Sequence, residues 1–114
     1  NPLACAAGVA VFETIEKEKL LKRAQQMGNY LRARLLRLAK RCPFVREVRG
    51  VGLMLGMQLS IDGKAVVAEC LKRGMLTNAT GDNVVRFMPA MTVTKAEVDR
   101  AMAIVEEAFA AVVR

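Results

Sequence analysis

An arginine in the stretch VVRFMP is the residue of this sequence best suited to bind a ligand. Arg86 interrupts an apolar segment, is expected to face the same side as Val84 and Met88, and stands shortly before a proline. A guanidinium holds a carboxylate through two parallel hydrogen bonds, which add affinity and fix orientation. The alternative is an exposed residue on a half-solvated sheet, and spacing alone does not decide between them. Arg49, next to Gly50, poses the same question, and there a structural ion pair is favoured.

Other common catalytic arrangements are not found. The sequence has no histidine, its hydroxyl residues form no nucleophile elbow, and its glycines form neither GxGxxG nor a P-loop. Cys5, Cys42 and Cys70 are widely separated and lack CxxC spacing, so no metal site is expected. We interpret them as reduced, mostly buried thiols of a cytoplasmic protein.

The net charge of +7 is concentrated in residues 16–41, which hold nine lysines and arginines against two glutamates. Apolar residues recur there at steps of four and three, which predicts an amphipathic helix. They are Leu20, Ala24, Met27, Leu31, Leu35 and Leu38. The basic residues surround the rest of the helix, which favours a solvated face. A basic α+β nucleic-acid-binding module stays open as an alternative.

The elements that must position Arg86 follow this helix. Pro43 ends the helical pattern, and two strands, antiparallel if they pair directly, are expected between Phe44 and Leu59 on either side of the Gly50-Val51-Gly52 turn. The remaining expected elements are a helix over 63–73 capped by Asp62 and ended by Gly74, a strand over 75–78, a turn over 80–83, a strand over 84–88, and a last helix that begins at the Thr94–Glu97 capping box. This order predicts an α+β fold, a small sheet of about three to four mostly antiparallel strands with helices packed on one face.

In the first residues, NPLACAAGVAVF, no charged or strongly polar side chain occurs from Leu3 to Phe12. A helix that is apolar all round is normally buried, so a covering surface is expected. The run is too short for a membrane span, which needs about 20 apolar residues. We therefore expect the chain to be cut from a larger protein.

Three segments in this order resemble one enzyme family: NPLACAAGVAVFETIE, VREVRGVGLMLGMQL and LTNATGDNVVRFMPAMTVTKAEVDRAM. They are similar to the C-terminal part of class III aminotransferases, which depend on pyridoxal phosphate, and most similar to the acetylornithine-type branch. The resemblance implies transfer of an amino group from N-acetylornithine to 2-oxoglutarate in arginine biosynthesis, giving N-acetylglutamate semialdehyde and glutamate. Ornithine, succinylornithine and 4-aminobutyrate aminotransferases stay open as alternatives.

The resemblance also implies an organisation and a site. Residues 1–15 would end a connecting helix from a large domain of the same chain, and residues 16–114 would form the C-terminal small domain of a cytoplasmic homodimer. Arg86 matches the family's arginine that binds the substrate α-carboxylate. The lysine and other groups that hold the cofactor lie in the large domain, so no catalytic, cofactor-binding or metal-binding residue is expected here, and this segment alone is expected to be inactive. Amino acids and 2-oxo acids are the expected substrates, with neither nucleic acid nor membrane as a partner.

Overall fold

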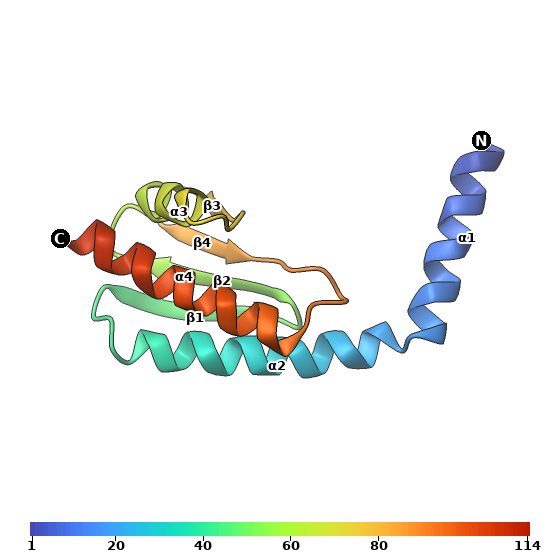
Figure 1. Cartoon of the computed structure of the whole chain (residues 1–114), viewed down its shortest axis with the longest axis horizontal. Helices are drawn as coiled ribbons and strands as arrows, with labels where there is room; N and C mark the ends of the chain where they lie inside the picture. The colour runs from blue at the N-terminus through green and yellow to red at the C-terminus, as the bar shows by residue number, and fades with distance from the viewer.

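The chain forms four helices and four strands, and the computed structural model describes residues 1–114. The elements are α1 (Pro2–Lys17), α2 (Leu20–Ala39), β1 (Val45–Val51), β2 (Met54–Leu59), α3 (Gly63–Lys72), β3 (Asn78–Thr80), β4 (Val84–Phe87) and α4 (Lys95–Val113). Figure 1 shows α4 lying across the sheet and α2 running along its β1 edge. None of the helices is both long and apolar enough to cross a membrane.

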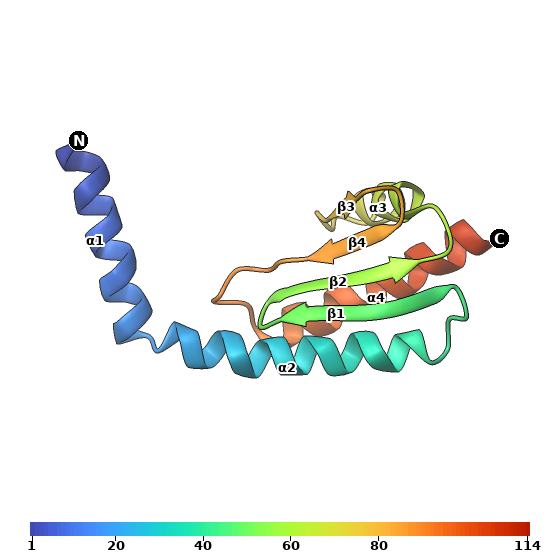
Figure 2. The ribbon, with the colours of Figure 1, turned by 180° about the vertical axis from the view of Figure 1, so that it is seen from behind.

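The sheet has the order β1-β2-β4-β3, and all three pairings are antiparallel. Side chains alternate across it, so that Leu55, Met57 and Leu59 of β2 are buried, as are Val85 and Phe87 of β4. These residues pack against apolar side chains of the three helices α2, α3 and α4. Seen from behind, the other face of the sheet has no helix over it (Figure 2). The predicted α+β class is confirmed.

The first helix projects away from the sheet, and none of its residues is buried (Figure 1). Asn1 caps it, because its Oδ1 accepts hydrogen bonds from the backbone N–H groups of Leu3 at 2.9 Å and Ala4 at 3.2 Å. Lys19 adopts a left-handed conformation with φ of 52° and breaks the chain's helical path. The bend therefore lies shortly after residues 1–15, and their assignment to a connecting helix stays a prediction.

The predicted helix caps are confirmed. Asp62 Oδ1 accepts a hydrogen bond from the backbone N–H of Lys64 at 2.9 Å at the start of α3. At the start of α4, the Thr94 hydroxyl accepts from the Glu97 N–H at 3.2 Å while the Glu97 carboxylate accepts from the Thr94 N–H at 2.8 Å. These local bonds begin both helices at the residues that the sequence predicts.

The predicted strand over 75–78 is wrong, because β3 spans Asn78–Thr80. The backbone N–H of Met75 donates to the Cys70 carbonyl at 3.0 Å and so belongs to the end of α3. Thr77 reaches β4 through its hydroxyl, which donates to the Arg86 carbonyl. Ladder pairing with β4 consequently begins only at Asn78, which lies opposite Arg86.

The β1–β2 hairpin packs directly on α2 at a glycine. A Cβ built on Gly28 would lie 2.3 Å from the carbonyl oxygen of Gly52, closer than atoms can approach. Gly28 is buried and brings the two backbones into contact. The turn lies at Gly52 and Leu53, later than the predicted Gly50-Val51-Gly52 turn, because Gly50 and Val51 still pair with β2. It needs glycine, since Gly52 has φ of 54°.

The cysteines differ in their surroundings, so the prediction of mostly buried thiols holds only in part. Cys70 is buried and Cys42 is half-buried, and burial raises the pKa of both thiols. Cys5 is exposed on α1, and none of the three forms a disulfide. The prediction is wrong for Cys5 because no other element covers α1 in this chain.

Candidate functional site

Arg86 lies on β4, on the face of the sheet that no helix covers. Its neighbours Val85 and Phe87 are buried on the opposite face, so alternation along the strand directs Arg86 outward. The antiparallel ladders place Gly56 of β2 on one side of it and Asn78 of β3 on the other. The hydroxyl of Thr77 donates to the Arg86 carbonyl and ties the adjoining segment to β4 at this residue.

The guanidinium of Arg86 has no carboxylate partner within the chain, because none of the seven ion pairs includes it. The guanidinium donates a single, long hydrogen bond within the chain, from Nη2 to the Met88 sulfur at 3.8 Å. Arg86 is half-buried, and because a thioether sulfur is only a weak acceptor, its guanidinium donors remain available to an added carboxylate. This is the arrangement expected of a ligand-binding arginine.

Arg86 borders two hollows. One, of about 480 Å³, lies on the open face and is also lined by Arg49, Gly56 and Met88. The other, of about 530 Å³, lies toward α4 and includes Thr77 and Glu97. Hydrogen bonds from Thr94 lower the pKa of Glu97, whose carboxylate is occupied as a helix cap. Glu97 is therefore used by the helix cap and does not pair with Arg86, so the Arg86 guanidinium is available to bind an anion.

Arg49 is held in a structural ion pair, as the sequence favoured. Its Nη1 lies 2.5 Å from Glu47 Oε2 and donates to Gln58 Oε1 at 2.7 Å. Both partners lie on the same face of the β1–β2 hairpin, one row away from Arg49 along the strands. Arg49 is therefore positioned by its own hairpin, whereas Arg86 is not.

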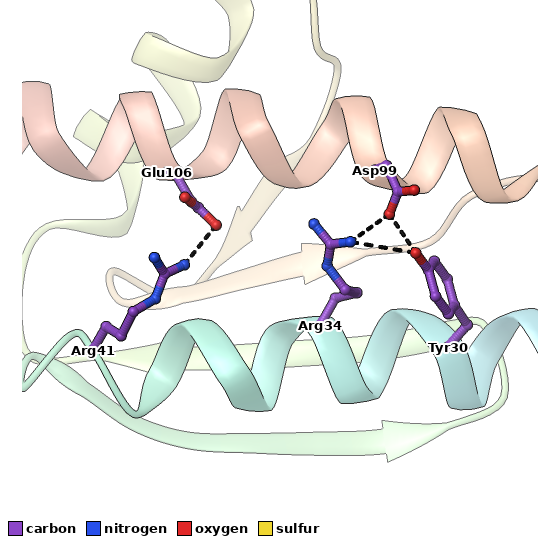
Figure 3. Close-up of polar contacts among 5 residues, drawn as sticks. All are labelled: Tyr30, Arg34, Arg41, Asp99 and Glu106. Carbon is purple, nitrogen blue, oxygen red and sulfur yellow. Dashed lines mark hydrogen bonds and ion pairs between the residues drawn. The ribbon is translucent and has the colours of Figure 1, made fainter.

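Basic residues of α2, and Arg41 just beyond its end, hold the domain together (Figure 3). Arg34 Nη1 lies 2.6 Å from Asp99 Oδ1 of α4, and the Tyr30 hydroxyl donates to the same oxygen. Arg41 Nη2 lies 2.7 Å from Glu106 Oε1. Arg32 donates a hydrogen bond to the Gly50 carbonyl at 2.9 Å, and Arg23 donates one to the Thr92 carbonyl at 2.7 Å. These contacts join α2 and the residue Arg41 after it to α4, to the segment before α4 and to the hairpin, and they explain part of the basic charge.

Two residues beside Arg86 were not found by sequence reasoning. Thr77 gave no signal, because its contact with Arg86 depends on how β3 approaches β4. Gly56 carried a usable signal, since a glycine inside a predicted strand often marks a close approach of a ligand or of another backbone. Both become visible only once the strand register is known.

Solved structures of aminotransferases share this fold. An aminotransferase from Bacillus anthracis superposes with a TM-score of 0.92 at 27% identity, covering 97% of this chain and 28% of that one. The lysine aminotransferase of M. tuberculosis gives a TM-score of 0.86 at 40% identity, covering 90% of this chain and 24% of that one. The fold is thus that of a segment of an aminotransferase.

The sequence comparison defines the family. The model of the family described as aminotransferase class-III matches residues 1–109. An acetylornithine aminotransferase of Gloeobacter violaceus is 46% identical over 112 residues, which cover 96% of this chain and 28% of that protein. An ornithine aminotransferase of Staphylococcus carnosus is 35% identical over 109 residues, which cover 96% of this chain and 27% of that protein. The chain belongs to the class III aminotransferases, and it spans about a quarter of the length of the curated relatives it matches.

Proposed function

We propose that this chain is part of a pyridoxal-phosphate-dependent aminotransferase that transfers the amino group of N-acetylornithine to 2-oxoglutarate. Within it, Arg86 binds the α-carboxylate of the substrate. The observation that carries the proposal is the half-buried Arg86, whose guanidinium forms no ion pair within the chain, beside an open hollow. Bidentate binding would fix the substrate's orientation as well as add affinity.

The residues around Arg86 do not form a cofactor site by themselves. Pyridoxal phosphate supplies an electron sink when bound, and holding its aldehyde needs a lysine amine. The residues lining the two hollows beside Arg86 include no lysine. In the proposed arrangement, residues outside this chain hold the cofactor, and the role of this chain is to bind and orient the substrate carboxylate.

The proposed organisation has a large domain in the same polypeptide. In it, residues 1–15 form the end of a connecting helix, and residues 16–114 form the small domain of a cytoplasmic homodimer. Support comes from the fraction of the relatives that this chain spans and from the apolar side chains exposed on α1, among them Leu3 and Phe12. Such a surface is expected to be covered in the complete protein.

The proposal is tested on the full-length protein loaded with pyridoxal phosphate. Transamination to 2-oxoglutarate is measured with N-acetylornithine, N-succinylornithine, ornithine, lysine and 4-aminobutyrate as donors. We expect the highest kcat/KM for N-acetylornithine. A higher kcat/KM for another donor would reassign the substrate within the family, and no transamination with any of them would overturn the proposed activity. Residues 1–114 alone serve as the control and should show no turnover.

A further inference from the structure

Gly56 occupies a position where a glycine weakens the fold. It lies in the interior of β2, which is paired on both sides by β1 and β4. A glycine inside a strand loses more conformational entropy on folding than other residues and offers no side chain to pack. The presence of a destabilising glycine at the centre of a small sheet therefore needs either a structural or a functional explanation.

The backbone gives no such reason. Gly56 is not among the glycines with positive φ, and a Cβ built on it would come near a single atom, the Val84 Cγ1, at 3.3 Å. By contrast, a Cβ on Gly28 or Gly50 would lie within 2.3 Å of backbone oxygen. A side chain at Gly56 would therefore need only a small adjustment of a neighbouring methyl group.

The space above Gly56 does give a reason. Register places Arg49, Gly56 and Arg86 in one row across three adjacent strands, all on the open face. Directly opposed Cβ atoms in an antiparallel pair lie about 4.5–5.5 Å apart, so a side chain at Gly56 would stand beside the stem of Arg86. It would project into the 480 Å³ hollow that both residues line.

We propose that Gly56 is a specificity-determining position, where the missing side chain lets the substrate held by Arg86 lie against the backbone of β2. This inference rests on the proposed function, because it takes the carboxylate at Arg86 as the anchor. The ligand class is a carboxylate whose adjoining carbon atoms occupy the floor between β1 and β4. A side chain at this position excludes those atoms in proportion to its volume.

The test uses Gly56→Ala and Gly56→Val in the full-length, cofactor-loaded protein. We expect kcat/KM for N-acetylornithine to fall by a few-fold with Ala and by at least about tenfold with Val, chiefly through a higher KM. The thermal midpoint should stay the same or rise, because valine is favoured in strands. A graded loss of affinity without loss of stability separates a site residue from a structural one.

Val84→Ala is the control for packing, because it removes the methyl group that a Cβ at Gly56 would approach to 3.3 Å. The double variant Gly56→Val/Val84→Ala is compared with Val84→Ala alone, and the loss in kcat/KM should persist because the hollow is still filled. If the double variant recovers both KM and stability, the glycine serves packing against Val84 and the inference is overturned. A fall in the thermal midpoint of both Gly56 variants that Val84→Ala does not relieve would instead indicate that another protein segment packs there, which also overturns it.

The Arg86→Ala variant separates this inference from the proposed function. If Arg86→Ala impairs carboxylate substrates while Gly56→Val keeps the wild-type KM, only the role of Gly56 fails. If Arg86→Ala has no effect on those substrates, the carboxylate anchor itself is wrong and the role of Gly56 is overturned with it.

Discussion

Arg86 of β4 and Gly56 of β2 are direct partners in the antiparallel ladder, on the face of the sheet that no helix covers. The pair places an unpaired guanidinium next to a position without a side chain. β2 and β4 are separated in the sequence by α3 and β3, so the helix crossover and the register together create this arrangement. The small sheet thus presents a carboxylate-binding group beside a clear stretch of backbone.

Gly28→Ala should destabilise the chain. The added Cβ would overlap the Gly52 carbonyl, and overpacking of this kind costs about 1–3 kcal/mol. Urea unfolding measures the change. Gly8→Ala is the matched control, because it makes the same substitution in a helix with no atom within 4 Å, and it should be neutral or stabilising. Equal stability of the two variants would contradict the close packing of the hairpin on α2.

Glu69 should contribute to stability in a pH-dependent way. Hydrogen bonds from Lys72 and Arg73 lower its pKa in the folded chain below the ordinary value of 4.5. As the pH falls, Glu69 is therefore protonated at a higher pH in the unfolded chain than in the folded chain. Its contribution to the free energy of unfolding is complete above the ordinary pKa and is lost as the pH falls through the folded pKa.

Thermal midpoints measured between neutral pH and about pH 3 test this contribution. Glu69→Gln should flatten the acid-side decline relative to wild type. Glu13→Gln is the control, because Glu13 forms no ion pair. If the slopes of Glu69→Gln and wild type are the same, the ion pairs of Glu69 contribute nothing.

Residues 1–114 should self-associate through α1. Leu3 and Phe12 are 80% and 73% exposed, and soluble monomers rarely present contiguous apolar surface of this kind. Light scattering should show dimers or larger species for the wild-type segment and a shift toward monomer for Leu3→Glu/Phe12→Glu. Leu76→Glu, at another exposed leucine, should leave the association unchanged. A monomeric wild-type segment with strong hydrogen-exchange protection over residues 3–12 would contradict this.

Binding of nucleic acid by the basic helix should be weak and readily abolished by salt. Arg34 and Arg41 are paired with acidic residues of α4, and Arg32 is bonded to the Gly50 carbonyl, which leaves fewer free cations than the net charge indicates. Fluorescence anisotropy with labelled RNA and DNA at low and moderate salt measures this. Submicromolar binding that survives moderate salt and is lost in Lys19→Glu/Lys22→Glu would support the nucleic-acid alternative.

Local signals predicted most of the secondary structure correctly. The capping residues Asp62 and Thr94 act through backbone groups a few positions away, so their sequence context contains the whole interaction. The turn at Gly52 is likewise determined by its own backbone conformation, with φ of 54°. The bend at Lys19 gave no such signal, because a left-handed lysine is not specified by its residue type.

Features that depend on contacts between residues far apart in the sequence were harder to predict. The position of β3 follows from the bond between Met75 and the end of α3 and from the register with β4. The candidate role of Arg86 could be predicted because a charge interrupts an apolar strand, whereas the place of Gly56 beside it requires the register of two strands that are not consecutive. The bond between Arg34 and Asp99, which lie 65 positions apart, depends on the packing of α2 on α4.

Substitution of Arg86 in the full-length protein tests the central claim most directly, with the first half-reaction followed by cofactor absorbance in single turnovers. Charge-assisted hydrogen bonds contribute about 1.5–3 kcal/mol, and each 1.36 kcal/mol is about tenfold in rate. Arg86→Ala should therefore lower kcat/KM for N-acetylornithine by between about tenfold and a few hundredfold. Arg86→Lys should cause a smaller loss, because lysine keeps the charge but cannot form the two parallel hydrogen bonds of a guanidinium. An amine donor without an α-carboxylate should be far less affected, and thermal stability should stay near wild type. Equal losses for both donors, or a collapse in stability with Arg86→Lys, would show that Arg86 is a structural residue of β4.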